Sequence, residues 1–355
     1  ASTPAFDPNI FTKGIPTQLW KDLNASPYKP LLNKPLGGVY PPGSTFKMIT
    51  AIAAEREGVD PSFAVSCNGK FWHGNRFFHC WKKEGHGRGI DMRNAIKHSC
   101  DTYFYTIATK IDIDTIAAVA SELGLGEQFE LGVPGLKNGT VPSREWKRAH
   151  YAGTPENQIW FPGETLSVAI GQGATTATPL QLAVMTARIA SGKAIRPRIV
   201  RLVGQRALPE VDAQHLSLTE EQLIVAREGM YKVVNEPGGT AVRSALENKD
   251  WKLAGKTGTA QVYRITEEER RRGLTKGEDL PWHRRDHALF VCYAPFDAPR
   301  YACSVVIEHG IGGAKYAGPK ARDIMTAVLQ KDPSRLKPIS PDSFSTASAA
   351  RASEG

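Results

Sequence analysis

Residue types that can carry nucleophilic chemistry stand together in the stretch YPPGSTFKMIT, residues 40–50. Ser44 and Lys47 are three residues apart, so on a helix their side chains would share one face. A serine hydroxyl is a poor nucleophile without a base, and a lysine can be that base if burial and nearby cations lower its pKa. At a helix start Ser44 would also have an N–H free to meet an oxyanion. The alternative is a capping serine followed by a solvent-facing lysine.

A second hydroxyl and an acid stand close together at Ser99-Cys100-Asp101, in KHSCDTYFY. We expect this stretch to lie on a loop between helical segments. It could place a second proton-carrying group beside the first serine, or it could simply cap a helix through Ser99 or Asp101.

A third group, Lys256-Thr-Gly-Thr259, lies in the strand-like run LAGKTGTAQVY. Gly258 lacks a side chain, so another backbone can approach the strand there. Thr257 and Thr259 can bond a substrate carboxylate or amide, and Lys256 supplies positive charge. Each of the three motifs is weak alone, but S-x-x-K, S-D-N and K-T-G in this order are typical of β-lactamases and penicillin-binding proteins.

Longer stretches resemble one family. YPPGSTFK, SCDTYFY, AIGQGATTATPLQLA and AGKTGTAQV look like the transpeptidase domain of class B penicillin-binding proteins, over roughly residues 1–332. WKKEGHGRG, VPSREWKR and FPGETLSVAIGQG look most like the penicillin-binding protein 2 (elongation, rod-shape) branch. The second motif ends in Asp101, where the family more usually has Asn. An Asp at this position resembles the penicillin-binding protein 2 branch.

The resemblance implies a catalytic set and a substrate-binding set, namely Ser44, Lys47, Ser99, Asp101 and Lys256, and Thr257, Gly258 and Thr259. In these sets Ser44 is the acylated nucleophile and Lys47 its base, while Ser99 relays a proton to the leaving amine. The threonines and Lys256 hold the substrate's terminal carboxylate, and the amides of Ser44 and Thr259 form the oxyanion hole. No cofactor is expected for catalysis.

The activity implied is cross-linking of peptidoglycan stem peptides by a D,D-transpeptidase that β-lactams would acylate. A serine β-lactamase, a D,D-carboxypeptidase and a non-catalytic β-lactam sensor are alternatives with the same motifs. The resemblance also implies a longer parent with an N-terminal membrane anchor and pedestal. That parent would lie at the periplasmic face of the inner membrane, with a glycan polymerase and elongation-complex proteins as partners.

Three of the five cysteines, with one histidine, form a candidate metal set: Cys67, Cys80, His86 and Cys100, spaced 13, 6 and 14 residues apart. Three thiols and an imidazole are a typical zinc set, but this spacing is not a tight zinc-finger pattern. Buried free thiols, or one disulfide with a thiol left over, remain alternatives.

The resemblance favours a structural zinc ion, since relatives include members with a metal site in this region. The histidines His73, His79 and His98 are lower-ranked alternates. Cys292 and Cys303 lie on adjacent predicted strands, and we expect buried thiols there rather than a disulfide.

The elements that must position these groups are helices followed by strands. Apolar spacing and capping residues predict helices at 44–58, 92–110, 114–124, 179–191, 219–234 and 319–331. Runs of β-forming residues predict strands at 195–203, 253–263, 287–296 and 300–310, the last two as a hairpin. This order predicts an α+β fold of the penicillin-binding transpeptidase and serine β-lactamase type, with helices on an antiparallel sheet plus an all-helical subdomain.

The remaining segments lack such patterns. Residues 1–43 should be an irregular lead-in, 60–90 a loop-rich insertion, and 333–355 a disordered tail after a transpeptidase domain at 1–332. The net charge is +9, but the lysines and arginines are spread along the chain and mixed with acidic residues, so we expect no nucleic-acid partner. The sequence contains no run of 18 apolar residues, so it predicts no membrane span.

Overall fold

The computed structural model describes residues 1–333 apart from 13, 201, 205, 209–211 and 264. Within them, one antiparallel sheet has the order β7-β8-β9 and is built from β7 (Ala254–Ala260), β8 (His287–Ala294) and β9 (Tyr301–Ile307). The shorter strands pair in twos: β1 (Val65–Cys67) with β4 (Gly87–Ile90), β2 (Lys70–His73) with β3 (Arg76–His79), and β5 (Leu202–Val203) with β6 (Arg206–Ala207).

The helices surround this sheet. They are α1 (Thr17–Ala25), α2 (Lys34–Gly37), α3 (Lys47–Arg56), α4 (Met92–His98), α5 (Asp101–Ala108), α6 (Ile113–Glu122), α7 (Arg144–His150), α8 (Pro162–Ala169), α9 (Pro179–Ser191), α10 (Glu220–Asn235), α11 (Glu267–Arg272) and α12 (Gly318–Lys331).

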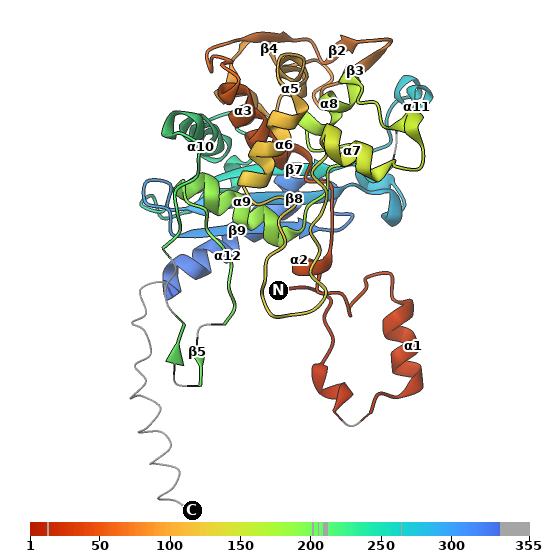
Figure 1. Cartoon of the computed structure of the whole chain (residues 1–355), viewed down its shortest axis with the longest axis vertical. Helices are drawn as coiled ribbons and strands as arrows, with labels where there is room; N and C mark the ends of the chain where they lie inside the picture. The colour runs from red at the N-terminus through yellow and green to blue at the C-terminus, as the bar shows by residue number, and fades with distance from the viewer. Residues whose placement is uncertain (13, 201, 205, 209–211, 264, 334–355) are drawn as a thin grey trace, which may run out of the picture.

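Both faces of the sheet are covered, because every residue of β8 after His287 is buried although neighbouring side chains point to opposite faces. Helix α12 packs on β8 and β9 from one side, and α9 and α10 lie on the other side (Figure 1). The predicted hairpin of the last two strands is confirmed, with Cys292 opposite Cys303. The arrangement confirms the α+β prediction.

Helix α3 is the centre of the helical part. Its residues from Lys47 to Ala54 are all buried, as expected for a helix enclosed on every side. It contacts α4, α5, α6 and α10, so other helices surround it. A 3₁₀ turn at Gly43–Phe46 leads directly into it, and the predicted helix from residue 44 therefore begins as a tighter turn.

Helix α9 begins and ends where predicted. Thr178 caps it by accepting a hydrogen bond from the Gln181 N–H, and the Gln181 side chain accepts one from the Thr178 N–H. This reciprocal pair is a capping box, and Pro179 at the first position suits it.

Several predictions were wrong in part. The helix expected at 92–110 is broken into α4 and α5, because Ser99 adopts a left-handed conformation with φ 54°. The strand expected at 195–203 is reduced to Leu202–Val203, since only β6 pairs with it. The lead-in at 1–43 contains the helices α1 and α2. Neither helix has a buried residue, so the sequence shows little of the apolar spacing that would predict a helix there.

The insertion at 60–90 holds two small antiparallel pairs, β1 with β4 and β2 with β3, although we expected loops. The sequence analysis also missed α7 and α8. Apart from Pro333, the tail predicted to be disordered lies outside the described residues.

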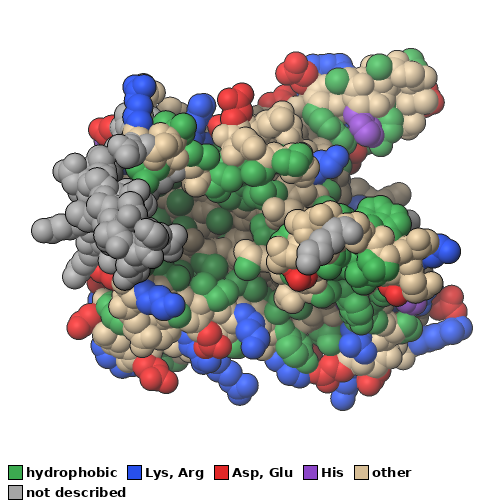
Figure 2. Space-filling model, turned by 90° about the horizontal axis from the view of Figure 1, so that it is seen from below, with side chains coloured by type: hydrophobic (Ala, Val, Ile, Leu, Met, Phe, Trp, Pro, Cys, Tyr) green, Lys and Arg blue, Asp and Glu red, His purple; other side chains and the backbone are tan. Residues whose placement is uncertain are grey.

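Helix α1 and the β5–β6 arm project beyond the sheet at the same end of the molecule (Figure 1). Each carries exposed apolar side chains, among them Trp20 on α1 and Val203 on the arm. The face seen from this end is hollowed and shows hydrophobic side chains inside the hollow (Figure 2). No helix in the described part of the chain has the length and apolar character needed to cross a membrane.

Candidate active site and candidate metal centre

Ser44 lies on a turn that is wedged between β7 and a glycine loop. Gly43 has φ 52°, and a Cβ added there would lie 2.5 Å from the Thr259 carbonyl oxygen. The Gly43 N–H donates to the Gly171 carbonyl over 2.9 Å, which fixes the turn from the opposite side. Only glycine fits a left-handed position this close to another backbone. The Ser44 side chain itself stays half-buried and reachable.

Lys47 is fully buried, one turn further along, so the solvent-facing alternative for this lysine is wrong. Its Nζ donates to the Ser99 carbonyl at 2.9 Å, the Ser99 Oγ at 3.1 Å and Asp101 Oδ1 at 2.7 Å. An ammonium has three N–H donors, and all three are therefore engaged with the second motif.

Ser99 is the point at which the three motifs meet. Its hydroxyl oxygen accepts from Lys47 at 3.1 Å and from Lys256 at 2.9 Å. When both lysines are protonated they can only donate, and the hydroxyl proton of Ser99 is then left for a third partner. The left-handed backbone at Ser99 turns its carbonyl and hydroxyl together towards Lys47. Neither Ser99 nor Asp101 is a side-chain N-cap, because Cys100 holds that position without a capping bond.

The electrostatics of this cluster follow from burial. Burial, and then the charge of Lys47, hold the pKa of Lys256 well below its usual range. Burial raises the pKa of Asp101, and the charge of Lys47 opposes that rise. The cluster therefore contains two buried lysines and one buried carboxyl group, which favours the arrival of an anion.

Strand β7 presents Thr257 and Thr259 on its outer edge. The Thr257 carbonyl accepts from Lys256 Nζ at 3.0 Å, and the Thr259 carbonyl accepts from the Gln172 side chain at 3.4 Å. Neither donor belongs to β8, so both carbonyls point away from the paired edge. In a strand the N–H and C=O of one residue point to the same side. The Thr259 N–H therefore also faces the Ser44 side, where an oxyanion would lie.

Gly258 allows this close approach, as the sequence predicted. A Cβ at this position would lie 2.8 Å from Thr45 Cγ2 and 3.0 Å from Leu289 Cβ. The Pro42 carbonyl oxygen would be only 3.1 Å away. A side chain here would push the Ser44 turn away from β7.

The four predicted metal ligands lie together, although their sequence spacing is loose. The candidate ligand atoms of Cys67, Cys80, His86 and Cys100 are all within 4.8 Å of one another. The alternates His73, His79 and His98 are not members of this group. The described cysteines are free thiols, which argues against a disulfide in the cluster. Cys292 is a buried thiol as expected, and Cys303 is a free thiol that is only half-buried.

The geometry fits a tetrahedral metal. His86 Nδ1 lies 3.5 Å from Cys67 Sγ and 3.6 Å from Cys80 Sγ. Usual zinc–sulfur and zinc–nitrogen bond lengths give a sulfur–nitrogen separation of about 3.5 Å across a tetrahedral ion. A hydrogen bond from Cys100, and then one from His86, lower the pKa of Cys80, which favours the thiolate that a metal requires.

Sequence reasoning missed two residues that contact the site. The Trp81 N–H donates to Asp101 Oδ2 at 2.9 Å, and its indole N–H donates to the His98 carbonyl at 3.1 Å. Thr240 Oγ1 lies 3.0 Å from Thr257 Oγ1. Trp81 follows a predicted ligand, Cys80, which is a signal that could have found it. For Thr240 the only signal in the sequence was the nearby end of a predicted helix.

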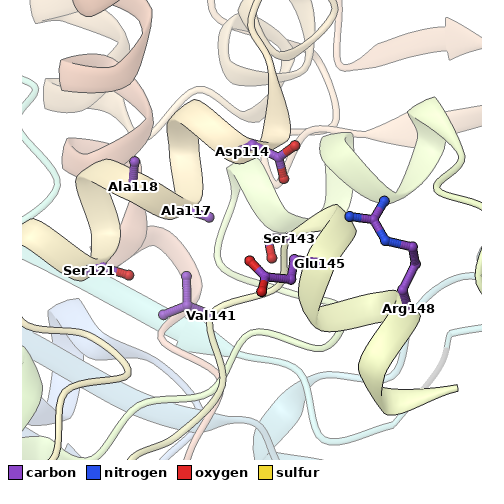
Figure 3. Close-up of a pocket in the computed structure, with 8 residues that line it drawn as sticks. All are labelled: Asp114, Ala117, Ala118, Ser121, Val141, Ser143, Glu145 and Arg148. Atoms are coloured by element: carbon purple, nitrogen blue, oxygen red, sulfur yellow. The ribbon is translucent and has the colours of Figure 1, made fainter. Parts of the chain in front are cut away.

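A pocket of about 390 Å³ lies elsewhere, between α6 and α7 (Figure 3). Asp114, Glu145 and Arg148 line it, and no member of the two clusters does. It is open and polar, and we assign no role to it.

Comparison with known proteins shows which family the chain matches. Residues 1–326 match the family described as the penicillin binding protein transpeptidase domain. The chain is similar to the peptidoglycan D,D-transpeptidase MrdA of Acinetobacter baumannii (37% identity over 325 residues) and of Haemophilus influenzae (34% over 343 residues). These alignments cover 89% and 93% of this chain but only 46% and 50% of those proteins. The chain thus spans about half the length of these curated relatives.

Solved structures give the same result. The fold is similar to Pseudomonas aeruginosa PBP2 in complex with WCK 5153, with a TM-score of 0.79 and 36% identity over 93% of this chain and 70% of that chain. It is also similar to Helicobacter pylori PBP2 in complex with MreC, with a TM-score of 0.80 and 32% identity over 93% of this chain and 57% of that one.

Proposed function

Because this chain belongs to the penicillin-binding protein transpeptidase family, we propose that it is the catalytic domain of a peptidoglycan D,D-transpeptidase of the penicillin-binding protein 2 type, acting through an acyl-enzyme on Ser44. The observation that carries the proposal is the Ser99 hydroxyl, which accepts hydrogen bonds from both Lys47 and Lys256 and so joins three motifs far apart in the sequence.

In the first step Ser44 Oγ attacks the carbonyl carbon of a D-Ala-D-Ala bond. Lys47, in its neutral form, takes the hydroxyl proton. The N–H groups of Ser44 and Thr259 stabilise the oxyanion, which is usually a large term in such reactions. The proton then passes from Lys47 through Ser99 to the leaving amine, because the Ser99 hydroxyl accepts from Lys47 and keeps its own proton to donate. D-Ala leaves and an ester remains on Ser44.

In the second step an amine of a neighbouring stem peptide attacks the ester. The same groups act in reverse: Ser99 and Lys47 accept the amine proton, and the Ser44 oxygen is protonated as it leaves. The Lys256 amine, as a hydrogen-bond donor beside the hydroxyls of Thr257 and Thr259, supports binding of the substrate's terminal carboxylate.

The test is intact-mass spectrometry after incubation with benzylpenicillin, followed by cross-linking of synthetic stem peptides. We expect a stable adduct of one penicilloyl group that peptide mapping places on Ser44, and a dimeric peptide product. Rapid turnover of penicillin would instead indicate a β-lactamase, and release of D-Ala without dimers would indicate a carboxypeptidase. An adduct without any reaction of stem peptides would indicate a sensor.

We further propose that the full-length protein works at the periplasmic face of the inner membrane with a glycan polymerase and elongation proteins. Support comes from the relatives: the Helicobacter pylori structure is a complex with MreC, and another similar structure, 36% identical, belongs to a peptidoglycan synthase complex that coordinates polymerization and crosslinking. These contacts are those of the relatives, and the full-length protein is needed to test them here.

We also propose that Cys67, Cys80, His86 and Cys100 hold a structural zinc ion. Four protein ligands leave no open coordination position, so the ion would supply folding energy rather than catalysis. Cys100 stands between Ser99 and Asp101, and Cys80 precedes Trp81, whose N–H bonds Asp101. The ion would therefore tie the insertion to the second motif.

Metal analysis of the purified chain tests the zinc proposal. We expect about one zinc per chain, and substitution Cys67→Ser should weaken zinc binding at least about tenfold. Cys292→Ser, which changes a buried thiol outside the cluster, is the matched control and should keep the metal. Less than about 0.2 equivalents of metal, with Cys67 and Cys80 linked by a disulfide, would refute the proposal.

A further inference from the structure

We propose that Thr240 is a positioning residue for the carboxylate subsite: its hydroxyl donates to Thr257 and so directs the Thr257 proton towards the substrate's terminal carboxylate. This inference rests on the proposed function. Thr240 is 17 residues before Thr257 and lies 3.0 Å from it, hydroxyl oxygen to hydroxyl oxygen.

Either hydroxyl could donate in this pair, and the proposed direction, from Thr240 to Thr257, is compatible with the other donor beside Thr257. Lys256 Nζ lies 3.5 Å from Thr257 Oγ1 and can only donate. A hydroxyl has one proton and two lone pairs, so Thr257 can accept from Lys256 and from Thr240 at once. With Thr240 as the donor, the Thr257 proton is left for a ligand. A carboxylate is the acceptor that suits a site with two buried lysines.

The segment 236–240 is held tightly, which fixes the position of the Thr240 hydroxyl. Glu236 forms ion pairs with Lys97 at 2.9 Å and with Lys232 at 2.7 Å. The Gly238 carbonyl lies 3.1 Å from His98 Nδ1, and the Thr240 N–H donates to the Lys97 carbonyl at 3.4 Å. The segment is thus bonded to the end of α4, directly before Ser99.

The same segment is also packed against the end of α10. A Cβ at Gly239 would lie 2.4 Å from the Val233 carbonyl oxygen, so only glycine fits there. The Ala241 N–H donates to that carbonyl at 2.9 Å. Thr240 therefore stands between two anchored neighbours. The structure connects the second and third motifs through this segment, in addition to the direct bond from Lys256 to Ser99.

The experiment compares Thr240→Val, which removes the hydroxyl at nearly constant volume, with Thr240→Ser, which keeps it. The probes are benzylpenicillin, which carries a carboxylate, and its methyl ester, which does not. We expect Thr240→Val to lower the second-order rate constant of acylation by benzylpenicillin about tenfold, as for one lost hydrogen bond to a charged group. Reaction with the ester should change less than about twofold, and Thr240→Ser should restore the benzylpenicillin rate to within about threefold.

Two further variants complete the design. Thr326→Val is the matched control, since its hydroxyl bonds only its own helix, at the Arg322 carbonyl, and it should behave as wild type. Thr240→Ala serves as a second variant without the hydroxyl if Thr240→Val does not fold.

The outcomes separate the two proposals. If wild type forms no penicilloyl adduct, the proposed function fails. Two results would overturn only the role of Thr240. In the first, the wild type reacts and the hydroxyl-free variant has the same acylation rate constant with benzylpenicillin. In the second, the variant's acylation rate constant falls equally with benzylpenicillin and with its methyl ester.

Discussion

Replacing Lys47 by alanine is expected to slow acylation of Ser44 about 10³-fold, which lies within the usual contribution of a general base. The Lys47 amine is fully buried and lies within hydrogen-bond distance of Ser99 and Asp101, so water cannot replace it without rearranging the second motif. The measurement is the second-order rate constant for formation of the penicilloyl adduct, taken on protein that is shown to be folded by circular dichroism.

The chain offers a matched control in Lys147. It too is a buried lysine on a helix, and it pairs with Glu164 and the Ile159 carbonyl. Lys147→Ala should lower stability by breaking this pair, but the folded protein should react with penicillin at close to the wild-type rate. A Lys47→Ala rate within about tenfold of wild type would exclude Lys47 as the base.

Replacing Lys256 by methionine is expected to slow acylation by benzylpenicillin about 10²-fold, and yet to leave stability unchanged or higher. The loss of rate follows from removing a charge and a donor beside the carboxylate subsite. The gain in stability follows because burial disfavours the charged lysine amine, a cost that a methionine side chain does not carry. The Ser99 hydroxyl would still accept from Lys47.

The pH dependence gives this prediction a second measurement. Burial holds the pKa of Lys256 in the folded chain well below the value of about 10.4 that an unfolded lysine has. Between these two pKa values the unfolded chain binds more protons, so this group makes the free energy of unfolding rise with pH. Below the folded pKa its contribution is constant, because both states are protonated.

Urea unfolding at pH 7 and pH 9.5 should therefore show a smaller rise for Lys256→Met than for wild type. Lys320→Met, an exposed change on α12, controls for loss of a surface charge and should keep the wild-type slope. Equal slopes for wild type and Lys256→Met would show that Lys256 is not the titrating group. A variant that unfolds far more easily than wild type at pH 7 would show that its hydrogen bonds outweigh the desolvation of its charge.

Much of the fold could be predicted, because it depends on local signals. Helix α9 is marked at its start by Thr178 and Pro179, and the β8–β9 hairpin by two apolar runs around a turn. The break at Ser99 could not be predicted, because a serine takes a left-handed conformation only where surrounding contacts impose it, here the bonds from Lys47. The strand expected at 195–203 had the right residues, but among those that the structure describes only Leu202 and Val203 pair with another strand.

The candidate site also has a part that the sequence predicted and a part that it did not. The sequence motifs predicted which side chains would meet, and Lys47, Ser99 and Lys256 do meet through one hydroxyl. Two further contacts left a weaker signal in the sequence. The Trp81 N–H that bonds Asp101 could belong to any residue type, and Thr240 reaches Thr257 only because two helices end nearby. Whether the cysteine cluster holds zinc stays a prediction.

Strand β7 lies at the edge of its sheet, and such an edge normally invites a further strand, from a second copy or from an aggregate. Here two outward carbonyls, those of Thr257 and Thr259, already accept from side chains of Lys256 and Gln172. A foreign strand would have to share each of these oxygens with a side chain that already donates to it, because a carbonyl has two lone pairs. The edge is therefore less open to a full strand than an unbonded edge would be, while its N–H groups can still receive the carbonyl oxygens of a bound peptide.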